Sequence, residues 1–211
     1  MAASAAVLMC RPAHYAIAYE INPWMHLRRP ANRLRALRQW RALAHRLATT
    51  LKLRVRLLPP RAGLPDLVFT ANAGLVAGRL PTAPVGQAGT FIRSNFRYRE
   101  RQGEEPVVER YFRRRGFRIL RLPRRFTFEG EGDALWMGDT LVLGFRFRSD
   151  ASAHAWLAQR LGREVLPVEL IDRRFYHLDT CFCPLDARSA LWYPRAFDRY
   201  GRRVLERLVP D

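Results

Sequence analysis

The pattern of apolar and polar positions predicts alternating helices and strands along this chain. Six apolar residues between positions 33 and 51 recur at the spacing of one helix face, and arginines occupy the opposite face. The six are Leu34, Leu37, Trp40, Ala44, Leu47 and Leu51. Residues 53–57 then alternate apolar residues with two arginines, a pattern typical of a strand, and two prolines end the run at 59–60.

A second apolar run occupies residues 67–77, and we interpret it as a strand interrupted between Asn72 and Gly74. The following stretch, 80–103, mixes proline, glycine, arginine and asparagine and predicts an irregular connection. Up to this point the pattern therefore predicts one helix among short strands.

Farther along the chain, the predicted elements repeat at a fixed interval. Helices are predicted over residues 104–115, 150–161 and 196–208, so their starts lie 46 positions apart. Gly116 and Gly162, which end the first two helices, have the same separation, and a strand ending in proline follows each. A period of this length is typical of rings and solenoids of supersecondary units.

Hairpins supply the two strands that precede a helix in this unit, whose order is strand–strand–helix–strand. They are predicted over residues 133–144, with Gly138 and Asp139 at the turn, and over residues 178–193. The strand that would complete the third unit would follow the last residue. We therefore expect an α/β fold in which residues 1–211 form a single incomplete domain.

Composition agrees with a globular protein. The 211 residues are 48% hydrophobic and 27% charged, which excludes collagen-like, low-complexity and disordered chains. No apolar run reaches the roughly 18 residues of a transmembrane helix, and the start MAASAAVLM does not resemble a signal peptide. We therefore expect a cytoplasmic protein without a membrane partner.

The net charge of +18 by itself predicts affinity for nucleic acid or another polyanion. However, Lys52 is the only lysine among 37 basic residues, which is typical of a GC-rich coding bias. The arginines are scattered over several predicted elements, whereas a nucleic-acid enzyme needs a basic stripe. We therefore expect no specific nucleic-acid partner, and charge-driven polyanion binding is kept as an alternative.

Three cysteines, Cys10, Cys181 and Cys183, are too few and too irregularly spaced for a disulfide scaffold. His177 lies four positions before Cys181, but the spacing does not match paired zinc ligands. We expect free cysteines in buried strands and neither a metal nor a cofactor.

Two clusters of polar residues suggest chemistry. In FEGEGDALW, Glu129, Glu131 and Asp133 are separated by single glycines, and such crowded carboxylates repel one another unless a cation lies between them. That cation is a metal or a guanidinium, whose donors match carboxylate geometry; the alternative is a tight turn with solvated acids. In HLDTCFC, Asp179 follows His177 at strand spacing, so we expect it to raise the pKa of a general acid–base histidine. The alternative is an ordinary core or surface histidine.

Several long segments, in one order from end to end, resemble a known group of enzymes. They are HYAIAYEINPWM at 14–25, GLPDLVFTANAGLV at 63–76, ERQGEEP at 100–106, FEGEGDALW at 128–136, GFRFRSD at 144–150 and FYHLDTCFCPL at 175–185. Together they resemble the amidinotransferase, dimethylargininase and arginine deiminase superfamily of guanidine-modifying enzymes, the penteins. The resemblance implies a pentein-type α/β propeller of five modules, of which this chain would hold about three.

The resemblance also implies roles for individual residues. Glu129 and Asp133 match the acids that hold the guanidinium, with Glu131 a lesser candidate, and His177 matches the catalytic histidine. The implied substrate contacts are Asn22, Asn72 and Arg101. The implied partner is a small guanidino substrate such as arginine or a methylarginine.

Two departures from the family pattern qualify the implied activity. The family nucleophile is a cysteine near the C-terminus, and none of the three cysteines here matches it. The segment SNFRYRER at 94–101 also lacks the His-Pro of close relatives. We therefore expect a hydrolase of the guanidino C–N bond, of arginine dihydrolase, deiminase or dimethylargininase type, that is inactive as this chain. The alternatives are an amidinotransferase and a non-catalytic guanidino-binding remnant. Unpaired strand edges would favour a homo-oligomer.

Overall fold

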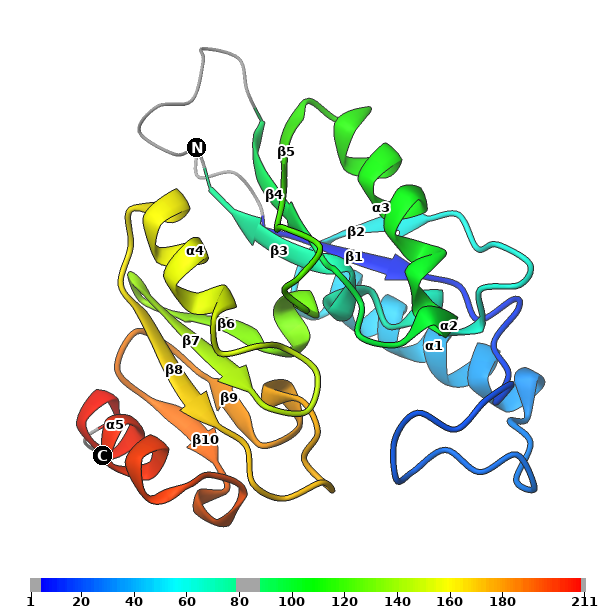
Figure 1. The fold of residues 1–211 in the computed structure, drawn as a ribbon. Helices are drawn as coiled ribbons and strands as arrows, with labels where there is room; N and C mark the ends of the chain where they lie inside the picture. The colour runs from blue at the N-terminus through cyan, green and yellow to red at the C-terminus, as the bar shows by residue number, and fades with distance from the viewer. Residues whose placement is uncertain (1–4, 79–87, 210–211) are drawn as a thin grey trace. The chain divides into compact units, whose positions relative to one another are not determined.

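The computed structural model describes residues 5–78 and 88–209 and divides into two units, Met1–Thr70 and Ala71–Asp211 (Figure 1). In the first unit, strands β1 (Ala6–Cys10) and β2 (Arg54–Leu58) pair in parallel. Helix α1 (Arg33–Thr49) connects them, and the side chain of Asn32 caps its first turn by accepting from the amide of Arg35. The predicted helix over 33–51 and the strand over 53–57 are thus confirmed, to within two residues at their ends.

The predicted strand over 67–77 is wrong in its first half. Residues Pro65–Val68 and Thr70–Ala73 form two 3-10 turns, and the strand β3 covers only Gly74–Ala77. Leu67 and Ala73 are buried without being extended, whereas Phe69 is exposed, because an apolar run of this length does not distinguish a turn from a buried strand.

Strands β3, β4 (Gly89–Arg93) and β5 (Phe117–Arg121) form the first sheet of the second unit. Strand β4 is antiparallel to β3 and parallel to β5. Helices α2 (Arg99–Gln102) and α3 (Glu104–Arg113) connect β4 to β5. The prediction of an irregular connection over 80–103 is therefore wrong where β4 and α2 form. Residues 80–87 of that stretch lie outside the described residues.

A second sheet has the same strand order and directions. Strands β6 (Ala134–Met137) and β7 (Thr140–Phe145) form the predicted hairpin, and β8 (Val165–Glu169) pairs in parallel with β7. Helix α4 (Ala153–Leu161) connects β7 to β8 and ends at Gly162, whose φ of 61° is left-handed.

The last elements are the antiparallel pair β9 (Phe182–Pro184) and β10 (Ala190–Trp192), followed by helix α5 (Arg199–Leu208). Asp198 caps α5 by accepting from the amides of Tyr200 and Gly201. Helices α4 and α5 each begin three residues after their predicted starts, because turn residues precede both. No described helix is long and apolar enough to cross a membrane.

Two hydrophobic clusters of the second unit hold the segments that carry the candidate chemistry. Phe128 is fully buried in the cluster around β3, β4, β6, β7 and α4. Leu178 is fully buried in the cluster around β7, β8 and α5. Each is the immediate neighbour of a candidate site residue, Glu129 or His177, so core packing fixes the backbone on which these two side chains stand.

Gly130 and Gly162 share a left-handed φ but differ in their surroundings. A Cβ at Gly130 would lie 2.5 Å from the backbone nitrogen of Gly74, whereas a Cβ at Gly162 would have open space around it. We expect G162A to lower the free energy of unfolding by about 1–2 kcal/mol through backbone strain alone. G130A should cost at least about 2 kcal/mol more, because backbone must move. Urea unfolding of both variants measures this, and equal losses would show that the turn at 130 is not tightly packed.

Candidate functional site

The candidate residues of the second unit lie on short turns that precede strands. Glu129, Glu131 and Asp133 flank or occupy the 3-10 turn Gly130–Gly132, just before β6. His177 stands just before a similar turn, Leu178–Thr180, which leads towards β9. Such turns place polar side chains at strand ends, where a rigid sheet supports them.

The carboxylate of Glu129 is completely buried and accepts hydrogen bonds from three segments of the chain. Its Oε2 is 2.8 Å from Nε2 of His177 and 3.0 Å from a guanidinium nitrogen of Arg148. Its Oε1 accepts from the amide of Arg97 at 3.3 Å. Burial alone would raise the pKa of Glu129, but the His177 hydrogen bond and the charges of His177 and Arg148 outweigh it and lower this pKa to about 2.

Arg148 was not among the residues selected from the sequence, although it lies in the quoted segment GFRFRSD. Its guanidinium is buried and lies between the rings of Tyr98 and Tyr176, with its central carbon 4.7 and 4.8 Å from their centroids. The acid predicted to hold a substrate guanidinium therefore already binds one from its own chain. The sequence did contain a signal for this pair: Arg148 lies in GFRFRSD, the quoted segment that follows the acidic segment FEGEGDALW.

Asp133 is equally buried and has neutral donors as partners. The hydroxyl of Ser149 donates to its Oδ2 at 2.6 Å, and the amide of Leu178 donates to Oδ1 at 3.2 Å. The Ser149 oxygen also accepts from the amide of Glu129, so this one side chain links the two acids. Burial raises the pKa of Asp133 well above its usual value, and the negative charge of Glu129 raises it further.

The prediction that Asp179 accompanies His177 is wrong. Asp179 is exposed within the turn after His177, so the two do not share the face of a strand. The carboxylate at His177 is that of Glu129, 48 positions earlier in the chain. Burial lowers the pKa of His177, against the opposing pull of Glu129, where the sequence predicted a raised pKa. The ring donates its Nε2 proton in this hydrogen bond, because an ionised carboxylate can only accept.

Arg101 and Asn72 contact each other in the same unit. Nε and Nη2 of Arg101 donate to the two carboxylate oxygens of Glu104, each at 2.8 Å. Nη1 of Arg101 donates to Oδ1 of Asn72 at 2.9 Å. A Cβ at Gly132 would lie 2.2 Å from Nδ2 of Asn72 and 3.4 Å from the His177 ring. The glycine between the acids therefore makes room for Asn72 and His177 to approach the same turn.

Two other predicted residues have local partners. Glu131 accepts from the amide of Val76 at 3.0 Å, and burial raises its pKa. Asn22 belongs to the first unit, where its Oδ1 accepts from the amide of Trp24 at 2.9 Å. Its predicted contact with a substrate stays a prediction.

The cysteines do not provide an activated thiolate at this site. Cys181 is buried, its thiol donates to the carbonyl of Leu178, and burial raises its pKa to about 12. Cys183 is exposed on β9, and Cys10 is buried in β1 of the first unit. The pKa values of Glu129, Asp133 and His177 are shifted in different directions, so this site can hold a cation and transfer a proton.

Removal of the Glu129 charge should destabilise the second unit severely. We expect E129Q to lower the free energy of unfolding by about 3–5 kcal/mol, since the buried Arg148 would lose its carboxylate partner. The matched control is E164Q on the surface, whose side chain accepts only from the hydroxyl of Thr140. Thermal and urea melts compare the two, and equal midpoints would contradict the structural role of the buried carboxylate.

The raised pKa of Asp133 predicts a pH-dependent difference between the wild type and D133N. Above the unfolded value of about 3.9, the folded state binds more protons than the unfolded state, so stability falls as pH rises towards the folded pKa. D133N does not titrate and removes this loss. Urea melts between about pH 4 and pH 8 should show the wild type losing stability relative to D133N. A difference that is constant over this range would contradict the prediction.

No protein-family profile matches this chain. Among curated proteins, it is 44% identical over 213 residues to the bifunctional arginine dihydrolase/ornithine cyclodeaminase ArgZ of a Synechocystis strain, covering 100% of this chain and 28% of that protein. It is 38% identical to the N(G),N(G)-dimethylarginine dimethylaminohydrolase of Mycobacterium tuberculosis, covering 96% of this chain and 63% of that enzyme. The chain therefore spans less than a third of the length of its bifunctional relative.

Among solved structures, the chain is similar to the N-terminal domain of ArgZ, described as a cyanobacterial arginine dihydrolase. That structure is a Cys-to-Ser variant with substrate bound. The TM-score is 0.85 and the identity 44%, over 96% of this chain and 72% of that domain. The mixed α/β architecture of the two proteins is therefore the same.

Proposed function

This chain belongs to the guanidine-modifying superfamily of arginine dihydrolases and dimethylarginine dimethylaminohydrolases, and from that membership we propose that it forms part of a hydrolase acting on the guanidino C–N bond of arginine or a methylarginine. The observation that carries the proposal is the buried hydrogen bond between His177 and Glu129 beside the buried Asp133. A histidine paired with one buried acid, with a second buried acid in the same turn as the first, suits a cationic substrate whose leaving group needs a proton.

The proposed reaction assigns catalytic roles to His177, Glu129 and Asp133. In this family chemistry a cysteine thiolate attacks the guanidinium carbon and forms a covalent adduct. His177, held by Glu129, takes the thiol proton as this thiolate forms, gives it to the departing amine or ammonia, and then takes a proton from the water that releases the adduct. Cys181 is unsuited to the attack, since its raised pKa keeps the thiol protonated at neutral pH.

Asp133 is the acid best placed to receive the substrate guanidinium. Glu129 is already paired with the cation of Arg148, whereas Asp133 accepts from a hydroxyl and an amide, which are neutral. An arriving cation would favour the ionised form of Asp133 and release its proton. We assign the remaining substrate contacts to Asn72 and Arg101, with Asn22 and Glu131 as further candidates in the same role.

The fold proposal extends the observed topology. The sheets β3–β5 and β6–β8 share one strand order, which supports a pentein-type propeller of which residues 1–211 form an incomplete single domain. A cytoplasmic location and a small guanidino partner complete this proposal. The high pKa of Cys181 favours one second candidate, a chain that binds guanidino compounds without converting them.

Calorimetric titration of the 211-residue chain with arginine, and with lysine as the control, tests guanidinium binding. We expect arginine to bind in preference to lysine, because a guanidinium presents two parallel donors to a carboxylate. D133N should weaken arginine binding about tenfold or more, through loss of a charge-assisted contact, while E164Q should bind as the wild type does.

The same samples test catalysis by citrulline and ammonia release. We expect none above background from arginine or dimethylarginine, since loss of a nucleophile costs about 10⁶ in rate. If the chain does release citrulline and C181S or C183S abolishes this release, the substituted cysteine is the nucleophile. Arginine binding that D133N leaves unchanged would overturn the assignment of Asp133.

A further inference from the structure

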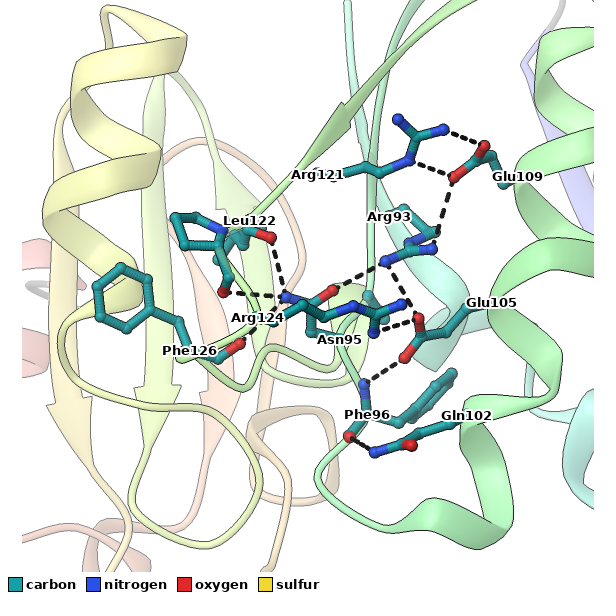
Figure 2. A network of polar contacts seen from close by, with 12 residues as sticks. Arg93, Asn95, Phe96, Gln102, Glu105, Glu109, Arg121, Leu122, Arg124 and Phe126 are labelled. Atoms are coloured by element: carbon teal, nitrogen blue, oxygen red, sulfur yellow. Dashed lines mark hydrogen bonds and ion pairs between the residues drawn. The ribbon is translucent and has the colours of Figure 1, made fainter.

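A second cluster of charged side chains, some buried and some exposed, lies between helix α3 and the strands β4 and β5 (Figure 2). Glu105 and Glu109 extend from α3 towards these strands. Arg93 on β4 contacts both, at 3.1 Å and 3.6 Å. Arg121 at the end of β5 binds Glu109 at 2.7 Å through its Nε, and Arg124 binds Glu105 at 2.7 Å. The cluster thus joins one helix to two strands through shared carboxylates.

The cluster carries more positive than negative charge. Arg113 also binds Glu109, at 2.6 Å, so four arginines face two glutamates and leave an excess of two positive charges. Burial lowers the pKa of Arg93, and repulsion from Arg124 and Arg121 adds to this effect. The buried Nε of Arg93 has no hydrogen-bond partner among the described residues. A buried cation with a spare donor and cationic neighbours would be stabilised by an anion.

A cavity of about 530 Å³ opens beside this cluster. Arg93, Arg97 and Arg124 contribute positive charge to its lining, against the single carboxylate of Glu105. Phe96, Pro106 and Phe126 contribute apolar surface. The size lies in the range of small-molecule sites in proteins, and the lining is mostly polar with a smaller apolar part.

The cavity is separate from the site around Glu129. None of Asn72, Glu129, Asp133 and His177 lines it. Arg97 belongs to both surroundings, since its backbone amide donates to Glu129 while the residue itself lines the cavity. A ligand here would therefore make its contacts with residues other than Asn72, Glu129, Asp133 and His177.

We propose that this cavity binds a small organic anion, with a phosphate or carboxylate group against Arg93 and Arg124 and an apolar part against Phe96 and Phe126. The side chain of Arg124 is 68% exposed, and Nη1 of its planar guanidinium binds the carboxylate of Glu105. Arginine binds both oxyanions through paired donors, so the chemistry is shared between the two ligand classes.

The test is calorimetric titration of the 211-residue chain with phenyl phosphate, benzoate and, at equal ionic strength, sodium chloride. We expect phenyl phosphate or benzoate to bind at one saturable site. The ligand with the higher affinity shows whether the site prefers a phosphate or a carboxylate group. R124Q should weaken binding about tenfold or more. R124K should weaken it less, because it keeps the charge but lacks the paired donors.

R114Q is the matched control for the net charge of +18, because Arg114 is an exposed arginine just past the end of α3 and does not line the cavity. It should bind phenyl phosphate as the wild type does, and so should D133N, which reports on the other site. Thermal melts without ligand verify that each variant is folded. Equal binding by R124Q and R114Q, or heats no larger than those of sodium chloride, would overturn the proposal.

Discussion

The buried carboxylate of Glu129 is the constraint on which the arrangement of the second unit depends. A fully desolvated negative charge is unstable without several strong donors. Here the donors come from Arg97, Arg148 and His177, three segments that are distant in sequence. Each segment must therefore hold its place for the charge to be tolerated. The same requirement orients the imidazole of His177, because the carboxylate accepts from Nε2 and thereby selects the tautomer.

Asp133 lies four residues from Glu129, but its pKa is shifted in the opposite direction. Both acids are buried, so burial pushes both pKa values upwards, and the difference comes from the partners. Glu129 has cationic partners that overcome the effect of burial, whereas the Ser149 hydroxyl and a backbone amide do not overcome it at Asp133. One glycine-spaced turn therefore places a permanent anion and a readily protonated acid side by side. Acid–base chemistry requires such a pair.

Local patterns in the sequence were sufficient for most elements of this fold. Helical spacing located α1 and α3, and the terminating glycines located the strands that follow α3 and α4. These local patterns failed for segments that are buried on all sides, because such segments show no alternation of apolar and polar residues. All five residues of β4 are buried, so the strand shows no alternation. The partner of His177 was misassigned because strand geometry was assumed for what is a turn. The true partner lies 48 positions away, beyond the reach of any local pattern.

The abundance of arginine has a structural consequence beyond net charge. Arg93, Arg101 and Arg148 are buried, and each binds glutamate, so part of the basic excess serves the interior. These internal guanidinium groups occupy the carboxylates that would otherwise attract a substrate guanidinium. Among the buried acids of the site, Asp133 has the Ser149 hydroxyl and the Leu178 amide as neutral donors. Burial favours its protonated form, so Asp133 avoids an isolated buried negative charge, and the proposed guanidinium would favour its ionised form.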